Sequence, residues 1–177
     1  MTGWPFSISL QRSYSGDMLY RPFRSGDFEA LYAIEKICFQ PPLRFGRLFM
    51  RSLIDAPNSE TWIAEEDGNM AGFAVADWAR GKKETVAYLQ TIEVVPPRRG
   101  RGVASELLRR IEGAALAAGA SALWLHVDAK NANAIRLYEK HGYAFHGERD
   151  HYYGPDRGAL IYRKALQEED ASRTRTL

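Results

Sequence analysis

The sequence has one cysteine, no long apolar run and almost no net charge, and each of these shortages narrows the class of protein. Cys38 has no second cysteine to pair with, which excludes an intramolecular disulfide framework. No apolar stretch approaches the ~20 residues that a membrane-spanning helix needs. Residues 1–10 also lack the basic and continuously apolar regions of a signal peptide. We therefore expect a cytoplasmic protein that does not act at a membrane.

The charge is too evenly balanced for a nucleic-acid-binding protein. Twenty-four Lys and Arg residues stand against 22 Asp and Glu residues, for a formal net charge of +2. A domain that binds nucleic acid is more usually basic across a whole face. One stretch is locally basic, and it contains Arg98, Arg99, Arg101, Arg109 and Arg110. This cluster favours a small polyanionic ligand, so no nucleic-acid partner is expected.

The length of 177 residues predicts one domain, which we expect over residues 18–166. A chain of this size buries about two-thirds of its unfolded surface and needs no metal or partner to fold. Residues 1–17 form an extension whose alternating apolar residues fit either a short extra strand or a loosely ordered terminus. The polar tail, residues 167–177, is expected to be disordered. A monomer and a homodimer both remain open.

Apolar periodicity predicts a mixed α/β (α+β) fold. Strands are expected over 18–23, 61–65, 70–78, 84–95, 122–128, 143–147 and 159–165, and helices over 28–38, 43–54, 103–118 and 132–141. Asp27 and Asn131 are candidate N-caps for the first and last of these helices. Polar turns join the second, third and fourth strands into an antiparallel meander. The helix over 103–118 is then a crossover, which makes the strands on either side of it parallel.

A glycine-bearing turn, Arg99-Gly100-Arg101-Gly102-Val103-Ala104, lies where the fourth strand gives way to the crossover helix. Two glycines without side chains let a phosphate approach unpaired backbone N–H groups and the positive end of the helix dipole. The Lys-Ser/Thr pair of a P-loop is missing, and so is a GxGxxG with its acidic ribose partner. The turn could simply join a strand to a surface helix, but it predicts a pyrophosphate-binding site.

The order of elements, combined with Arg99-x-x-Gly102-x-Ala104 and then Asn131 and Tyr138, resembles the GCN5-related N-acetyltransferase (GNAT) superfamily over residues 18–166. That resemblance implies a central mixed sheet of about seven strands flanked by about four helices. Residues 125–143, LHVDAKNANAIRLYEKHGY, and the pair Tyr152-Tyr153 are similar to protein N-terminal acetyltransferases, which include the ribosomal-protein-alanine enzymes of bacteria. The implied activity is direct acetyl transfer from acetyl-CoA to an amine in a ternary complex.

The resemblance also implies a binding site for acetyl-CoA as co-substrate. Backbone groups of the fourth strand would pair with the pantetheine arm like an added strand, and the glycine-bearing turn would bind the pyrophosphate, with Arg99 and Arg101 adding charge at its rim. The Glu93 side chain is expected to be solvated. The implied donor-binding residues are Ile92, Glu93, Val94, Arg99, Gly100, Arg101, Gly102, Val103, Ala104, Ser105, Asn131 and Tyr138.

Attack on a thioester needs a neutral amine, whereas an α-amino group with a pKa near 7.7–8.0 is mostly protonated at pH 7. A base and an acid are therefore required, and His126 has a suitable intrinsic pKa for the base. The ribosomal enzymes carry Glu at the matching position, but some eukaryotic relatives pair a His there with a Tyr that corresponds to Tyr88. We expect His126 as base, Tyr88 assisting through ordered water, and Tyr138 as acid. Plain packing roles remain the alternative for all three residues.

The acceptor site is implied by the same relatives. Phe39, Gln40 and Pro41 would contact the first residues of a peptide, with Tyr152 and Tyr153 opposite. Relatives often carry Pro directly after this Phe, whereas Gln40 intervenes here, so the first-residue preference is left open. We expect the α-amine of a protein or peptide N-terminus as acceptor and no metal. The alternatives are a small-molecule amine acetyltransferase of the same fold and a non-catalytic acyl-CoA-binding module.

Overall fold

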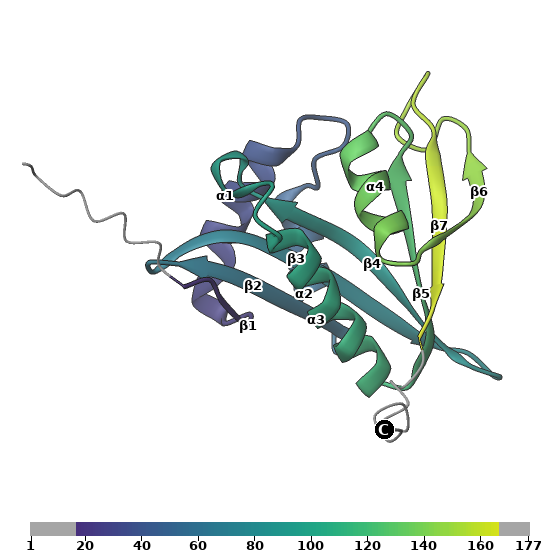
Figure 1. Cartoon of the computed structure of the whole chain (residues 1–177), viewed down its shortest axis with the longest axis horizontal. Coiled ribbons are helices and arrows are strands. Elements are labelled where there is room, and N and C mark those ends of the chain that lie inside the picture. Colours follow the sequence, from purple (N-terminus) through teal and green to yellow (C-terminus); the bar gives the residue numbers. More distant parts are fainter. Residues whose placement is uncertain (1–16, 167–177) are drawn as a thin grey trace, which may run out of the picture.

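The computed structural model describes residues 17–166 as a seven-stranded mixed sheet with helices on both faces (Figure 1). The strands are β1 (Leu19–Pro22), β2 (Ser59–Glu66), β3 (Asn69–Arg80), β4 (Thr85–Val94), β5 (Ala120–Asp128), β6 (Ala144–Arg149) and β7 (Ala159–Ala165). The helices are α1 (Phe28–Cys38), α2 (Arg47–Ile54), α3 (Val103–Ala117) and α4 (Ala132–Lys140), with short 3-10 turns at Ser25–Asp27 and Pro96–Arg98. The expected extra strand near the N-terminus and the C-terminal tail lie outside the described residues.

The strand order is β1-β2-β3-β4-β5-β7-β6. Every neighbouring pair is antiparallel except β4 and β5, which run parallel because α3 carries the chain back across the sheet between them. The expected meander, the parallel crossover, and the sheet of about seven strands with four helices are all confirmed.

Two apolar cores hold the helices to the sheet. On one face, Leu107, Leu108 and Ile111 of α3 pack with Leu123 and Leu125 of β5, and α4 adds Tyr138 to this cluster. On the other face, the buried residues are Phe28, Leu31, Ile34, Met50, Ile63, Phe73 and Val75, from α1, α2, β2 and β3. The sheet therefore has an α3/α4 face and an α1/α2 face, and side chains from either can reach its centre.

The parallel strands β4 and β5 separate before they end. Their pairing runs from Thr85 with Ala120 to Leu89 with Leu125 and goes no further. On its other edge, β4 contains a β-bulge: Leu89 pairs with Ala76 and Thr91 with Val75, which leaves Gln90 without an opposite residue. A bulge bends a strand and increases its twist. The result is a wedge-shaped opening between residues 90–94 and 126–128, with β4 and β5 diverging in Figure 1.

Two local expectations were wrong. Helix α2 begins at Arg47 rather than 43, because the preceding residues form a turn in which Leu43 donates to the Gln40 carbonyl (2.9 Å). Asp27 does not cap α1: its carboxylate accepts from the backbone N–H of Arg24 (2.7 Å) and pairs with Arg21 (2.7 Å). The carboxylate binds the charged guanidinium more strongly than it would bind a backbone N–H of the helix, so it is not available as a cap.

None of the helices described between residues 17 and 166 combines the length and apolar character needed to cross a bilayer.

Candidate active site

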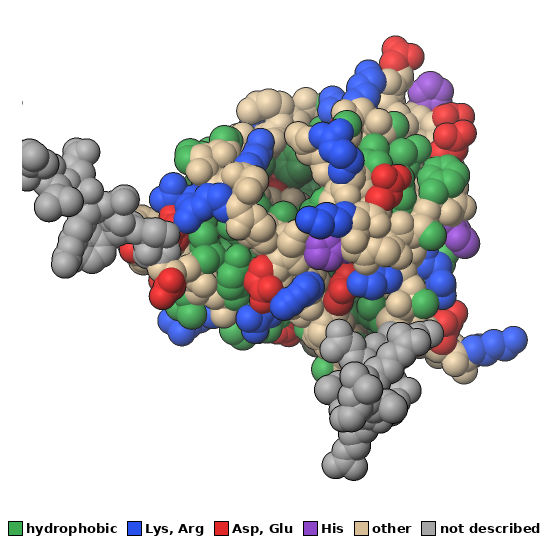
Figure 2. Space-filling view, viewed as in Figure 1, with side chains coloured by type: hydrophobic (Ala, Val, Ile, Leu, Met, Phe, Trp, Pro, Cys, Tyr) green, Lys and Arg blue, Asp and Glu red, His purple; other side chains and the backbone are tan. Residues whose placement is uncertain are grey.

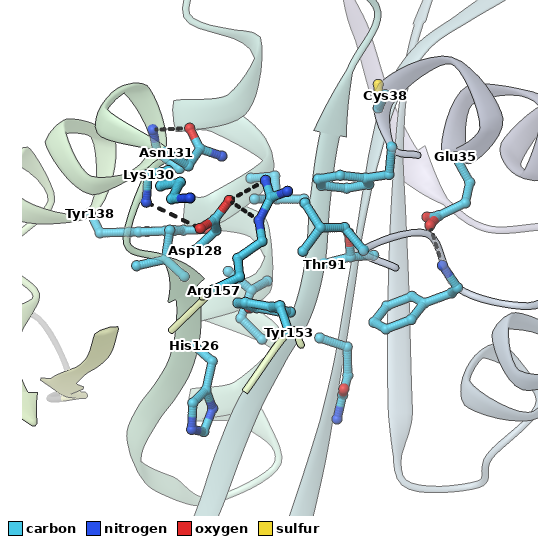
Figure 3. Close-up of a pocket in the computed structure, with 18 residues that line it drawn as sticks. Glu35, Cys38, Thr91, His126, Asp128, Lys130, Asn131, Tyr138, Tyr153 and Arg157 are labelled. Carbon is cyan, nitrogen blue, oxygen red and sulfur yellow. Dashed lines mark hydrogen bonds and ion pairs between the residues drawn. The ribbon is translucent and has the colours of Figure 1, made fainter. Parts of the chain in front are cut away.

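A cavity of about 380 Å³ occupies the opening between β4 and β5. Figure 2 shows it as a hollow with apolar atoms inside and basic side chains around it, and Figure 3 shows the residues that line it. The lining comes from β4, β5, α4, the α1–α2 segment and the β6–β7 loop. Among the residues predicted from the sequence, Phe39, Ile92, His126, Asn131, Tyr138 and Tyr153 contribute to it.

His126 lies on β5 and is directly hydrogen-bonded through Nδ1 to the Tyr88 hydroxyl of β4. Its neighbours Leu125 and Val127 are in the core beneath α3, so strand alternation turns the imidazole to the α1/α2 face. Nε2 is buried and has no hydrogen-bond partner among the described residues. Burial, reinforced by Arg149, lowers the pKa of His126 below its ordinary value. The ring is therefore neutral at pH 7 and can accept a proton.

Tyr138 reaches the cavity from the opposite face of the sheet. It is only 5% exposed and packs in the core shared by α3 and α4. Burial raises its pKa, so its hydroxyl stays protonated. The start of α4 is fixed by Asn131, whose Oδ1 accepts from the Ala134 N–H (3.1 Å) as expected of an N-cap. A proton acceptor and a proton donor thus lie on opposite sides of one opening.

The glycine-bearing turn has the geometry of an anion site. Gly100 and Gly102 have φ of 73° and 81°, and a Cβ on either would meet no atom within 4 Å. The backbone N–H groups of residues 100–105 donate to no described residue, and the first helical hydrogen bond of α3 is that of Glu106 to the Gly102 carbonyl (3.1 Å). Unpaired N–H groups at a helix N-terminus suit a phosphate. The chain therefore has the groups that a pyrophosphate would need.

The edge of β4 next to the opening presents its backbone. Val95 donates to the Ala71 carbonyl of the neighbouring chain segment (2.9 Å), so alternation turns the backbone groups of Val94 and Ile92 toward the opening. The Val94 carbonyl accepts from Arg99 Nε (2.9 Å), and its N–H faces the gap. An extended thioester arm could add to this edge like a strand.

Arg99 and Arg101 are exposed beside the turn, and each also contacts the protein. Arg101 pairs with Glu66 (2.6 Å), which is 5% exposed, and Arg98 pairs with the same carboxylate. Arg99 binds the Val94 carbonyl and contacts the Cys38 thiol. A nearly buried carboxylate that binds two guanidinium groups holds the turn to the end of β2. These contacts hold the turn in place, and the charge expected at its rim stays a prediction.

The expected acceptor residues are divided. Phe39 and Tyr153 line the cavity, whereas Gln40, Pro41 and Tyr152 do not. Tyr152 instead stacks on the His126 ring, with centroids 4.5 Å apart and planes 3° from parallel. The α1–α2 segment and the β6–β7 loop lie close together: a Cβ built on Gly154 would be 3.9 Å from Pro42 Cγ.

The Glu93 side chain was expected to be solvated, and this was wrong. It is 3% exposed, accepts from Thr91 Oγ1 (3.0 Å) and lies beside Glu35 of α1, which is fully buried. Glu35 also accepts from the Phe45 N–H (2.6 Å). Burial and the neighbouring Glu35 raise the pKa of Glu93 to about 10. Glu93 is therefore protonated at pH 7, and its neighbour Glu35 ties α1 to the segment before α2.

Sequence reasoning missed Glu35, Asp128 and Arg157 as cavity residues. Glu35 could have been noticed, because it follows Leu31 by four residues and so lies on the apolar side of α1. Asp128 and Arg157 form an ion pair (2.6 Å) across 29 positions of sequence. Nothing local in the sequence signals that pairing.

Comparison with known proteins agrees with this architecture. Streptothricin acetyltransferase of Streptomyces lavendulae is 37% identical over 91 residues, which cover 51% of this chain and 47% of that protein. N-alpha-acetyltransferase MAK3 of Arabidopsis thaliana is 29% identical over 92 residues, covering 52% and 48%. The chain thus spans about half the length of these curated relatives.

Solved structures share the fold over most of their length. The ribosomal-protein-S18-alanine N-acetyltransferase of Escherichia coli superposes with a TM-score of 0.74 at 24% identity, covering 88% of this chain and 98% of that one. Arabidopsis thaliana NAA60 in complex with a bisubstrate analogue gives 0.74 at 23% identity, covering 84% and 98%. The Acetyltransferase (GNAT) family matches residues 28–143, from α1 past the end of α4 and including the whole β4–β5 opening. The chain therefore belongs to the acetyltransferase (GNAT) family.

Proposed function

We propose that this protein transfers an acetyl group from acetyl-CoA to an amine, and that the acceptor is the α-amino group of a protein or peptide N-terminus. One observation carries the proposal: His126, neutral and with an unpartnered Nε2, and the protonated Tyr138 flank the opening between β4 and β5 from opposite faces. Acetyl transfer to an amine needs a base and an acid on either side of the reacting carbon.

His126 acts as the base in this proposal. When Nδ1–H donates to the Tyr88 oxygen, Nε2 keeps its lone pair and can take the proton of an incoming ammonium, directly or through a water. The hydrogen bond to Tyr88 also fixes the plane of the ring. Tyr88 is thus a positioning residue, and its hydroxyl stabilises the imidazolium that forms.

Tyr138 acts as the acid. Its buried hydroxyl stays protonated and donates to the sulfur as the thiolate leaves. The backbone of Ile92 and Val94 holds the thioester arm, while the N–H groups of residues 100–105 bind the pyrophosphate. Cys38 is a poor nucleophile because burial raises its pKa to about 11. That supports direct transfer in a ternary complex without an acyl-enzyme.

Two observations support an α-amine acceptor. An α-amino group has a lower pKa than a lysine side chain, so a histidine base can deprotonate it more readily. The cavity walls toward α1 and the β6–β7 loop carry Phe39, Leu43, Phe45 and Tyr153, which suit the apolar first side chain of a peptide. The small-amine alternative is favoured by the identity to streptothricin acetyltransferase.

The proposal is tested by acetyl-CoA-dependent thiol release with short peptides of varied first residue. Each peptide is offered with a free and with a blocked N-terminus, beside free lysine, a polyamine and streptothricin. We expect release with free N-termini and its loss on blocking. Release that depends only on side-chain or small amines contradicts the acceptor assignment, and tight acetyl-CoA binding without transfer to any amine contradicts the enzyme assignment.

A further inference from the structure

The loop between β6 and β7 is held in a strained conformation. His151 and Asp156 have φ of 56° and 59°, and Gly154 between them has φ of 121°. In the part of the chain that the structure describes, the only other non-glycine residue with positive φ is Asp67 of the β2–β3 turn. Left-handed backbone costs an L-residue about 1–2 kcal/mol and persists only where the surroundings hold it. The contacts that hold this loop are therefore informative.

The strongest of these contacts is an ion pair between Arg157 and Asp128. Arg157 Nε and Nη2 both donate to Asp128 Oδ2, at 3.0 and 2.6 Å. The second carboxylate oxygen of Asp128 accepts from the Lys130 N–H (3.1 Å), which fixes the orientation of the group. The Asp128 side chain is 9% exposed, so this pair is far less screened than a surface salt bridge. Figure 3 shows it inside the cavity, between the α4 residues and Thr91.

Hydrogen bonds within the loop connect Arg157 to the part of the loop that carries the aromatic residues. The backbone N–H of Tyr153 donates to the Arg157 carbonyl (3.0 Å), and the backbone N–H of Arg157 donates to the Gly154 carbonyl (3.2 Å). The Gly158 carbonyl accepts from Ala129, next to Asp128 (3.1 Å). Tyr152 and Tyr153 contact each other edge to face, with centroids 4.8 Å apart. The position of Tyr152 against His126 therefore depends on where Arg157 is held.

We propose that Asp128 and Arg157 are positioning residues, whose ion pair latches the loop of residues 150–158 to the end of β5, holds Tyr152 against the His126 imidazole and keeps Tyr153 in the wall of the acceptor site. The geometry of the latch stands by itself, and its effect on acceptor binding rests on the proposed function. A latch of this kind sets both the shape of the acceptor site and the hydration of the base.

The hydration of His126 gives a readout that needs no substrate. The groups that face its ring are Tyr88 from β4, Arg149 from β6 and Tyr152 from the loop. Burial is the main cause of its lowered pKa, and Arg149 is the lesser one. Releasing the loop admits water to the ring, so the pKa of His126 moves up toward its ordinary value.

The test is an NMR titration of the His126 Cε1–H in the full chain, assigned among the four histidines with His126→Gln. Arg157→Gln is compared with Arg157→Lys, Asp128→Asn and the Arg157→Gln/Asp128→Asn double variant. Arg51→Gln is the matched control, because it removes the exposed pair with Asp55 on α2. We expect Arg157→Gln to raise the pH midpoint of the His126 titration and to speed amide hydrogen exchange of Tyr153 at least tenfold. Arg157→Lys should restore both quantities in part. The double variant should show the same changes as each single variant.

The proposed latch is contradicted if Arg157→Gln leaves the His126 titration midpoint and the Tyr153 amide exchange rate as in wild type. It is also contradicted if the effects of Arg157→Gln and Asp128→Asn add in the double variant. Kinetics then test its purpose: with any acceptor that the peptide panel identifies, Arg157→Gln should raise the acceptor KM about tenfold and leave the acetyl-CoA KM unchanged. An unchanged acceptor KM contradicts the positioning role even where the titration shifts. If no amine is acetylated, the proposed function fails, while the titration still decides on the latch.

Discussion

The imidazole of His126 combines two properties that a base for amine acetylation needs. One nitrogen is engaged by Tyr88, which fixes the ring, and the other is buried without a partner. Burial lowers the pKa, so the basic form persists to more acidic pH than in a free histidine. Tyr138 has the opposite property, since burial raises its pKa and keeps its proton available. The same physical cause thus prepares one residue to accept a proton and the other to donate one.

Replacing His126 by Gln should lower kcat by about 10²–10⁴-fold, because general base catalysis is lost while the donor site is untouched. In wild type, kcat/KM should fall as pH decreases through the lowered pKa of His126, where the imidazolium has no lone pair to offer. His126→Gln should remove this acid limb. His146→Gln is the control, because His146 packs on Trp124 outside the cavity. An acid limb that survives in His126→Gln would contradict the assignment.

His126 could be proposed from its intrinsic pKa, and the resemblance to the acetyltransferase family implied the roles of Tyr138 and Asn131 in the same strand–helix unit. Glu35, Asp128 and Arg157 could not, because their roles arise from partners far away in the chain. The Glu93 side chain was misjudged for the same reason: the helix that buries it, α1, comes more than 50 residues earlier.

At the scale of elements, the proposed function assigns the donor site to the strand β4, the helix α3 and the turn between them. The glycines of that turn take positive φ, which lets the backbone N–H groups converge before the helix begins. Glu66 of β2 holds the turn from outside through Arg98 and Arg101. The glycine-bearing turn could be predicted because it lies within six consecutive residues, whereas its ion pairs with Glu66 could not.

Gly102→Ala should raise the Kd for acetyl-CoA about tenfold, because an alanine at φ of 81° shifts the backbone that carries the N–H groups. Gly113→Ala is the matched control within α3: its Cβ would meet no atom within 4 Å, and the change should stabilise the helix by about 0.5–1 kcal/mol. Isothermal titration calorimetry with acetyl-CoA and thermal unfolding of both variants provide the comparison. Unaltered acetyl-CoA affinity in Gly102→Ala would rule out the turn as the binding site.

At the scale of the whole molecule, two helical layers meet across a sheet that is open at its centre. The meander of β2, β3 and β4 and the parallel crossover follow from local turns and from the βαβ connection, so they could be predicted, whereas the place of β7 between β5 and β6 was not. The separation of β4 and β5 could not, because it depends on a bulge that leaves no mark in the apolar pattern. The carboxyl pair of Glu35 and Glu93 spans one of these layers and couples the stability of the molecule to pH.

Glu93 binds a proton in the folded state up to pH about 10 but loses it near pH 4.5 when unfolded. Between these values the folded state binds more protons, so stability falls as pH rises, by at most about 1.4 kcal/mol per pH unit. Glu93→Gln, which mimics the neutral acid, should remove this dependence and raise the Tm at pH 9 relative to wild type, with little change at pH 5. Equal pH dependence of Tm in both proteins would show that Glu93 is ionised when folded.

The bulge at Gln90 has a further consequence for this fold. A regular β4 would have alternating backbone groups positioned to continue the ladder with β5 toward Asp128, and the sheet would close. One surplus residue interrupts that continuation, and the β4 backbone groups that do not pair with β5 are those that the proposed function assigns to the thioester arm. If the proposed function holds, these peptide groups bind the thioester arm in place of the neighbouring strand, so donor binding and sheet pairing use the same backbone groups.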